Sequence, residues 1–128
     1  MQTRTYYQPQ PPVKTSVDEQ GSTWAALIHV SQLAHGIVPM AGIVAPIIIW
    51  QMKKDEYPEI DEHGKMVCNW MISQFIYTVI FGILAIFFIG IPFLFALAIL
   101  SIVFPIIGAV KAYDGKFWKY PLTIRVFR

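Results

Sequence analysis

Charge is distributed very unevenly along this chain of 128 residues. Its ten basic and eight acidic residues all lie outside two long blocks, Trp24–Met52 and Met66–Val110. An uncharged apolar run of about 20 residues is long enough to cross a lipid bilayer as a helix, and the second block has room for two crossings. The sequence therefore predicts an all-α integral membrane protein whose charged segments lie at the membrane surfaces.

Composition supports this class. Hydrophobic residues make up 55% of the chain and charged residues 14%, a balance that departs from soluble proteins toward membrane proteins. The formal net charge of +2 gives no reason to expect a nucleic-acid partner. Cys68 stands alone, which excludes an internal disulfide bond.

The segment 1–21 is polar and proline-rich, so we expect a disordered cytoplasmic tail there. It does not combine a basic start with an apolar centre, so we expect no secretory signal peptide and assign membrane targeting to the first block. The transmembrane domain would then comprise residues 22–128. Ser22 or Thr23 would cap its first helix.

The first block allows two architectures. As one helix it would be about 43 Å long, which exceeds a hydrocarbon core of about 30 Å. It forms either one kinked span or a hairpin of two short helices, over about 23–37 and 42–52. Residues that break or kink helices interrupt its middle: Gly36, Pro39, Gly42 and Pro46.

The second block is simpler, because the turn signal Ile89–Pro92 divides it into two segments. We expect antiparallel helices over about 66–89 and 92–113, with Asp61 as a candidate cap of the first of them. If the first block is also a hairpin, all ten basic residues share one side of the membrane. The positive-inside rule makes that side cytoplasmic, with both termini on it. We therefore favour two hairpins over a kinked span, which would export the N-terminal tail.

Polar side chains inside the two blocks need partners, because hydrocarbon offers them no hydrogen bonds. His29 and Gln32 lie on a stripe of small or polar residues that we expect to face protein, although His29 is also a candidate proton relay or ligand. On the third helix we expect interhelical hydrogen bonds from one polar face: Asn69, Ser73 and Tyr77. Further sites of close helix packing or kinking are Gly82, Ser101 and Pro105.

The C-terminal tail mixes basic and aromatic residues, which suit the headgroup layer of a membrane. The candidate lipid-interface residues are Lys116, Trp118, Lys119 and Arg125. The stretch 120–127 is also β-prone and could pair with a partner strand, but we favour an interfacial lid. Motifs for catalysis or metal binding are missing from the sequence, so we expect no enzyme activity, no cofactor and no metal site.

Four motifs occur in a specific order along the chain. They are Thr23-Trp24-Ala25, Lys53-Lys54-Asp55, Asp61-Glu62-His63-Gly64-Lys65 and Tyr120-Pro121-Leu122-Thr123-Ile124-Arg125. Together they resemble a family of small bacterial membrane proteins, a domain of unknown function described as similar to the Tic-twenty component of chloroplast protein import. The chain departs from that family at Asn69-Trp70-Met71, where members often have Asn-Phe-Gln. The Tic-twenty-like resemblance implies a bacterial inner-membrane protein with four hydrophobic segments, and it implies no activity.

Three functions are compatible with these features. We favour a non-enzymatic accessory or assembly subunit that acts through helix association in the bilayer, with a membrane-protein partner or as a homo-oligomer. A small transport or channel component would use the stripe that contains His29 and Gln32 as a polar path. A lipid-surface sensing module would use the basic and aromatic C-terminal tail.

Overall fold

All regular elements are helical in the part of the chain that the structure describes, residues 15–128 of a computed structural model. Helix α1 spans Ser16–Ser31 and continues into a short 3-10 helix, η1, at Gln32–Gly36. Helices α2 (Ala41–Lys53), α3 (Glu59–Ala85) and α4 (Gly90–Tyr113) follow, and an irregular C-terminal segment covers residues 114–128. The predicted all-α class is confirmed for these residues.

Helix α1 begins earlier than predicted because of its cap. The Thr15 hydroxyl accepts a hydrogen bond from the Asp18 backbone N–H at 3.3 Å, and the Asp18 carboxylate accepts one from the Thr15 N–H at 2.9 Å. This reciprocal capping box starts a helix at Ser16. The expected capping role of Ser22 or Thr23 was wrong, because both residues lie inside α1. Of the predicted tail, residues 1–14 lie outside the described part of the chain.

Helix α3 also begins earlier, at Glu59, with Pro58 at its N-cap position. The prediction that Asp61 caps this helix was wrong: Asp61 lies in the first turn, where its carboxylate pairs with Lys65 at 2.6 Å and accepts a hydrogen bond from Trp50 Nε1 at 3.0 Å. Acidic residues in a first turn interact favourably with the positive end of the helix dipole. The charged segment before Met66 is therefore part of the helix.

The turn between α3 and α4 comes slightly before the predicted one. It includes Phe88, whose φ of 62° is left-handed, and α4 starts at Gly90. A Cβ atom at Gly90 would collide with the Phe81 carbonyl, so glycine permits the tight closure. Pro92 is accommodated in the first turn of α4, where no intrahelical partner for its missing N–H is required.

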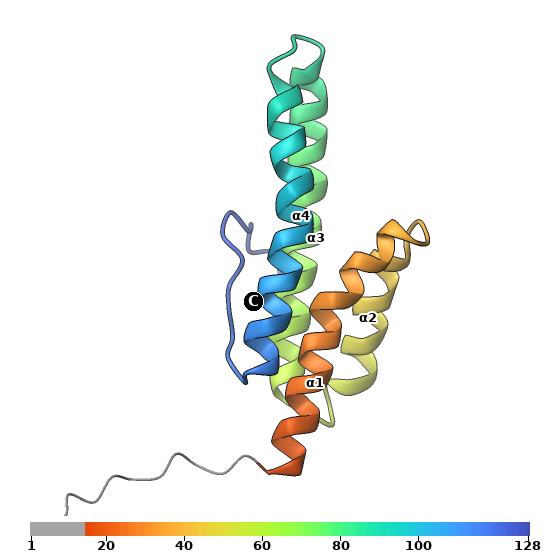
Figure 1. Ribbon diagram of the computed structural model, residues 1–128, viewed down its shortest axis with the longest axis vertical. Helices are drawn as coiled ribbons and strands as arrows, with labels where there is room; N and C mark the ends of the chain where they lie inside the picture. The colour runs from red at the N-terminus through yellow and green to blue at the C-terminus, as the bar shows by residue number, and fades with distance from the viewer. Residues whose placement is uncertain (1–14) are drawn as a thin grey trace, which may run out of the picture.

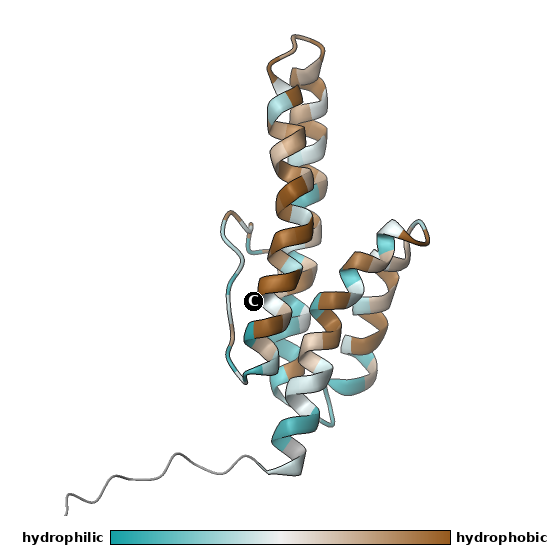
Figure 2. Cartoon of the chain, in the orientation of Figure 1, coloured by the Kyte–Doolittle hydropathy of each residue, from teal (hydrophilic) through white to brown (hydrophobic). Residues whose placement is uncertain are grey.

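The helices form a tall pair and a short pair (Figure 1). Helices α3 and α4 lie side by side and extend well beyond α1 and α2, which lie beside each other and join at residues 37–40. The start of α1, the loop between α2 and α3, and the end of α4 all lie at one end of the molecule. Hydrophilic residues gather at this end, whereas the far half of α3 and α4 is mainly hydrophobic (Figure 2).

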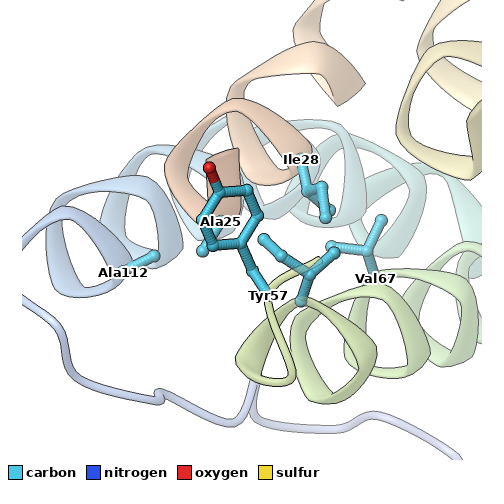
Figure 3. Packing of buried hydrophobic residues seen from close by; sticks show 6 residues of the cluster. Ala25, Ile28, Tyr57, Val67 and Ala112 are labelled. Atoms are coloured by element: carbon cyan, nitrogen blue, oxygen red, sulfur yellow. The ribbon is translucent and has the colours of Figure 1, made fainter. Parts of the chain in front are cut away.

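The core fills the end where the two pairs meet. Ala25 and Ile28 of α1 pack near Val67 of α3 and Ala112 of α4 (Figure 3). Tyr57, from the loop between α2 and α3, completes this cluster. The Tyr57 hydroxyl donates a hydrogen bond to Gln20 Oε1 at 2.8 Å, which ties this loop to α1. A second cluster contains Trp70, Phe104 and Tyr120. It joins α3 and α4 to the C-terminal segment.

The far half of the α3–α4 pair exposes large apolar side chains, including Phe75 (71% exposed), Phe88 (80%) and Phe95 (71%). Water-soluble monomers rarely carry apolar surface on this scale. Both α3 and α4 are long and apolar enough to cross a membrane, whereas α2 is apolar but shorter. The chain is therefore a membrane-type protein with two candidate spans in its described part.

Among the seven residues singled out for packing or kinking, three are buried, three are exposed and Ser101 is partly buried. Pro46 and Pro105 are fully buried, and a Cβ at Gly42 would collide with the Gln32 carbonyl at the close approach of α2 to η1. Ser101 donates a hydrogen bond to the Ala98 carbonyl at 2.6 Å within α4. Around Gly36 and Gly82 a Cβ would meet nothing within 4 Å, and Pro39 is exposed. Close packing at Gly82 is thus not made inside the described chain.

Candidate functional site

A cluster of buried polar side chains joins three parts of the fold. It consists of His29 in α1, Gln32 in η1, His63 in α3 and Tyr120 in the C-terminal segment, and we call it the polar cluster. His29 Nδ1 lies 2.6 Å from the Tyr120 hydroxyl, and His29 Nε2 lies 2.9 Å from His63 Nδ1. The Gln32 amide donates to the Tyr120 hydroxyl at 3.1 Å and to the His29 carbonyl at 3.3 Å. His29 and Tyr120 are each only 1% exposed.

The hydrogen bonds of the polar cluster have a consistent direction. Burial raises the pKa of the Tyr120 phenol, so the hydroxyl stays protonated. Because Tyr120 already accepts from Gln32, its own proton goes to His29 Nδ1. His29 then carries its proton on Nε2 and donates it to His63 Nδ1, an assignment that follows from the network of partners. Both ring nitrogens of His29 are therefore occupied.

Two neighbouring residues pack tightly against the polar cluster. Gly108 of α4 leaves no room for a side chain, because a Cβ there would lie 2.6 Å from His29 Nδ1 and 2.8 Å from the Tyr120 hydroxyl. The Phe117 ring approaches the edge of the His63 ring, with centroids 5.4 Å apart. Such an enclosed, mutually bonded cluster stabilises one arrangement of α1, α3 and the C-terminal segment.

The sequence located half of the polar cluster. His29 and Gln32, which the sequence placed on one stripe, are both buried. His63 and Tyr120 were not assigned to it, because His63 was placed in a loop and Tyr120 in an interfacial tail. Buried histidines usually have hydrogen-bond partners, but the sequence around His63 (Glu62 and Gly64) and around Tyr120 (Lys119 and Pro121) does not mark these two residues as the partners. His35 lies exposed on η1, away from the cluster.

A second set of polar residues anchors the C-terminal segment to α3. The Asn69 side chain accepts hydrogen bonds from the backbone N–H groups of Val126 (3.0 Å) and Phe127 (2.6 Å) and donates one to the Phe127 carbonyl at 2.9 Å. One turn further on, the Ser73 hydroxyl accepts from the Ile124 N–H at 2.7 Å. The Tyr77 hydroxyl donates to the Leu122 carbonyl at 2.6 Å.

These contacts correct the sequence interpretation of Asn69, Ser73 and Tyr77. The three residues share one face of α3, as expected, but they bind the backbone of the C-terminal segment and not another helix. The backbone of residues 122–127 has no strand partner in the described chain, so side chains at four-residue spacing on α3 satisfy it in place of a sheet.

The four candidate lipid-interface residues have different environments. The half-buried Trp118 packs on Phe104 and Tyr120, with ring centroids 5.6 and 5.4 Å away. Lys116, Lys119 and Arg125 are exposed. Lys119 and Arg125 line a pocket between α3 and the C-terminal segment, and Lys116 does not.

Comparison with known proteins assigns a family. Neither the curated proteins nor the solved structures contain a match to this chain. The model of the magnetosome magnetite crystal formation protein family matches residues 20–127.

This match overturns the resemblance to the Tic-twenty-like family. The charged motifs behind that resemblance lie at the end of α2 and in the first turn of α3, where many helical membrane proteins need charged residues at a wet surface. The chain belongs to the magnetosome magnetite crystal formation protein family.

Proposed function

We propose that this protein is a non-enzymatic accessory of magnetite crystal formation that acts from within the magnetosome membrane. The family supports the process, and the polar cluster supports the absence of catalysis. His29, which is only 1% exposed, uses both ring nitrogens to bind other residues of the same chain. A catalytic base must lie within hydrogen-bond reach of a substrate, and burial keeps substrates away from this ring.

The protein would act by association in the bilayer, with a membrane-protein partner or a second copy. Support comes from the far half of α3 and α4, where apolar side chains surround the helix pair and Gly82 leaves open space for a close neighbour. Small residues at a helix surface allow backbones to approach closely in membranes. The alternative of a polar path through His29 and Gln32 has less support, because both side chains are buried and bonded inside the chain.

We further propose that the chain enters the membrane as two hairpins from the cytoplasmic side. At about 1.5 Å per residue, α3 and α4 reach about 40 and 36 Å, whereas α1 and α2 reach only about 24 and 20 Å. The short pair would turn back inside the hydrocarbon layer at residues 37–40. Location in the inner membrane and cytoplasmic termini remain predictions from the sequence.

Cysteine labelling tests this topology. In a Cys68→Ala background, Thr15→Cys and Asp55→Cys are expected to react with an impermeant maleimide from the same side of sealed vesicles, because the start of α1 and the loop between α2 and α3 lie at the same, hydrophilic end of the molecule (Figures 1 and 2). Val38→Cys, at the turn of the short pair, is expected to resist the reagent from that side. Labelling of positions 15 and 55 from opposite sides would establish the single kinked span instead.

The functional role is tested in a magnetite-forming bacterium that lacks its own members of the family. Expression of this chain is expected to restore the size distribution of the crystals, measured by electron microscopy, and His35→Leu should restore it equally because His35 is exposed outside the polar cluster. Pull-down in mild detergent is expected to retrieve a stoichiometric partner or a defined oligomer. Unchanged crystals, or a strictly monomeric protein without partners, would contradict the proposal.

A further inference from the structure

A basic pocket lies between the first turns of α3 and the C-terminal segment. It has a volume of about 310 Å³. From α3 it is lined by Glu62, Lys65, Met66 and Asn69, and from the C-terminal segment by Phe117, Lys119, Thr123, Arg125, Phe127 and Arg128. The segment is fixed over this pocket by the hydrogen bonds of Asn69 and Ser73, so its walls belong to two anchored elements.

The charges of the pocket lining are strongly unbalanced. Four basic side chains face one acidic side chain, Glu62, which leaves an excess of three positive charges. Lys65 is partly neutralised by Asp61 at 2.6 Å. Lys119, Arg125 and Arg128 form no ion pair with Asp or Glu within 4 Å in the described part of the chain. They therefore provide the positive charge available to a ligand.

A further polar group in the lining has no partner. The Thr123 hydroxyl is buried and makes no hydrogen bond within the described residues. Buried polar atoms in folded proteins almost always find a partner, and an exception calls for a bound water, ion or ligand nearby. An anion with several acceptor oxygens has the chemistry to accept hydrogen bonds both from a hydroxyl and from cations among the lining residues.

The pocket lies where α3 changes from charged to charge-free sequence, which in a membrane helix corresponds to the interface. Lys65 ends the charged start of α3, and Met66 begins its charge-free run. Phe117 and Phe127 contribute aromatic rings to the lining. Cations beside aromatic side chains at this depth are suited to lipid phosphates, which guanidinium and ammonium groups bind through charge-assisted hydrogen bonds.

From this arrangement we propose that the basic pocket binds the phosphate headgroup of an anionic phospholipid. Lys119 and Arg125 hold the phosphate oxygens, and the two phenylalanine rings contact the start of the acyl chains. The proposal depends on insertion in a membrane but not on the role in magnetite formation, so each can fail without the other.

Native mass spectrometry of the full chain in detergent tests this site with phosphatidylglycerol as the probe. One phosphatidylglycerol is expected to bind per chain, and phosphatidylcholine should bind much more weakly. The double variant Lys119→Gln/Arg125→Gln is expected to lose about thirtyfold in affinity, since each basic residue contributes about fivefold at an anionic lipid surface. Lys116→Gln is the matched control: it removes one exposed lysine of the same segment outside the pocket and should retain the wild-type affinity.

Three outcomes would overturn the site. The first is that phosphatidylcholine binds as tightly as phosphatidylglycerol, and the second is that Lys116→Gln loses as much affinity as the double variant. The third is that inorganic phosphate competes as strongly as the lipid, which would identify free phosphate as the ligand. Arg125→Lys keeps the charge and should retain most of the binding. If the double variant fails to fold by circular dichroism, Lys119→Gln alone, at an exposed position, is expected to lose about fivefold.

Discussion

Replacing His29 with leucine is expected to lower the free energy of unfolding by about 2 to 3 kcal/mol. Leucine has a similar volume, so the main loss is chemical. His63 Nδ1 and the Tyr120 hydroxyl both lose the partner that now lies within 2.9 Å of them. A single interhelical hydrogen bond in a membrane protein is worth only about 0.6 kcal/mol. The larger effect is expected because one substitution leaves two buried groups unsatisfied.

Thermal unfolding in detergent, followed by circular dichroism, measures this effect. His35→Leu is the control, because it makes the same chemical change at an exposed position six residues along the chain and should change stability by less than about 0.5 kcal/mol. A double-mutant cycle of His29→Leu with Tyr120→Phe should give a coupling energy of about 1 kcal/mol. Equal destabilisation by the two histidine substitutions, or zero coupling, would show that the polar cluster does not stabilise the fold.

Gly64→Ala in α3 is expected to destabilise the protein by about 2 kcal/mol. A Cβ at Gly64 would collide with the ring of Trp50 in α2. That ring cannot easily move away, because its Nε1 donates to Asp61 at 3.0 Å and its edge packs on Phe127 with centroids 6.0 Å apart. Helix α3 would therefore have to move away from α2 at this point of contact.

Gly82→Ala provides the matched comparison in the same helix. A Cβ at Gly82 would meet no atom within 4 Å, so alanine should stabilise α3 by about 0.5 to 1 kcal/mol through its higher helix propensity. We therefore expect the free energy of unfolding to fall in Gly64→Ala and to rise in Gly82→Ala, although the substitution is the same. If both substitutions change the free energy of unfolding in the same direction by a similar amount, then helix propensity, and not contact with Trp50, determines the effect at Gly64.

The boundaries of the helices show what sequence patterns could and could not provide. The predicted helix 42–52 agrees with α2 to within one residue at each end. This apolar run is bounded by a turn on one side and by lysines on the other. The starts of α1 and α3 were each missed by seven residues, since Thr15 and Pro58 begin helices inside charged sequence. Charge indicates which residues contact water, but local features decide where these helices begin: the capping box of Thr15 at α1 and the helix-compatible φ of −56° at Pro58 before α3.

The sequence by itself determined the class of this protein: charge-free blocks of this length favour helices in a membrane, since apolar side chains leave water and backbone groups must bond locally. It also identified His29, Gln32, Asn69, Ser73 and Tyr77 as side chains that need partners. Only the tertiary structure decided what those partners are. The polar cluster joins His29 to His63 and Tyr120, which are 34 and 91 residues away, and the C-terminal segment lies along α3 because Asn69 and Ser73 bind its backbone. Contacts over such separations depend on how whole helices pack, and a local pattern carries no information about that.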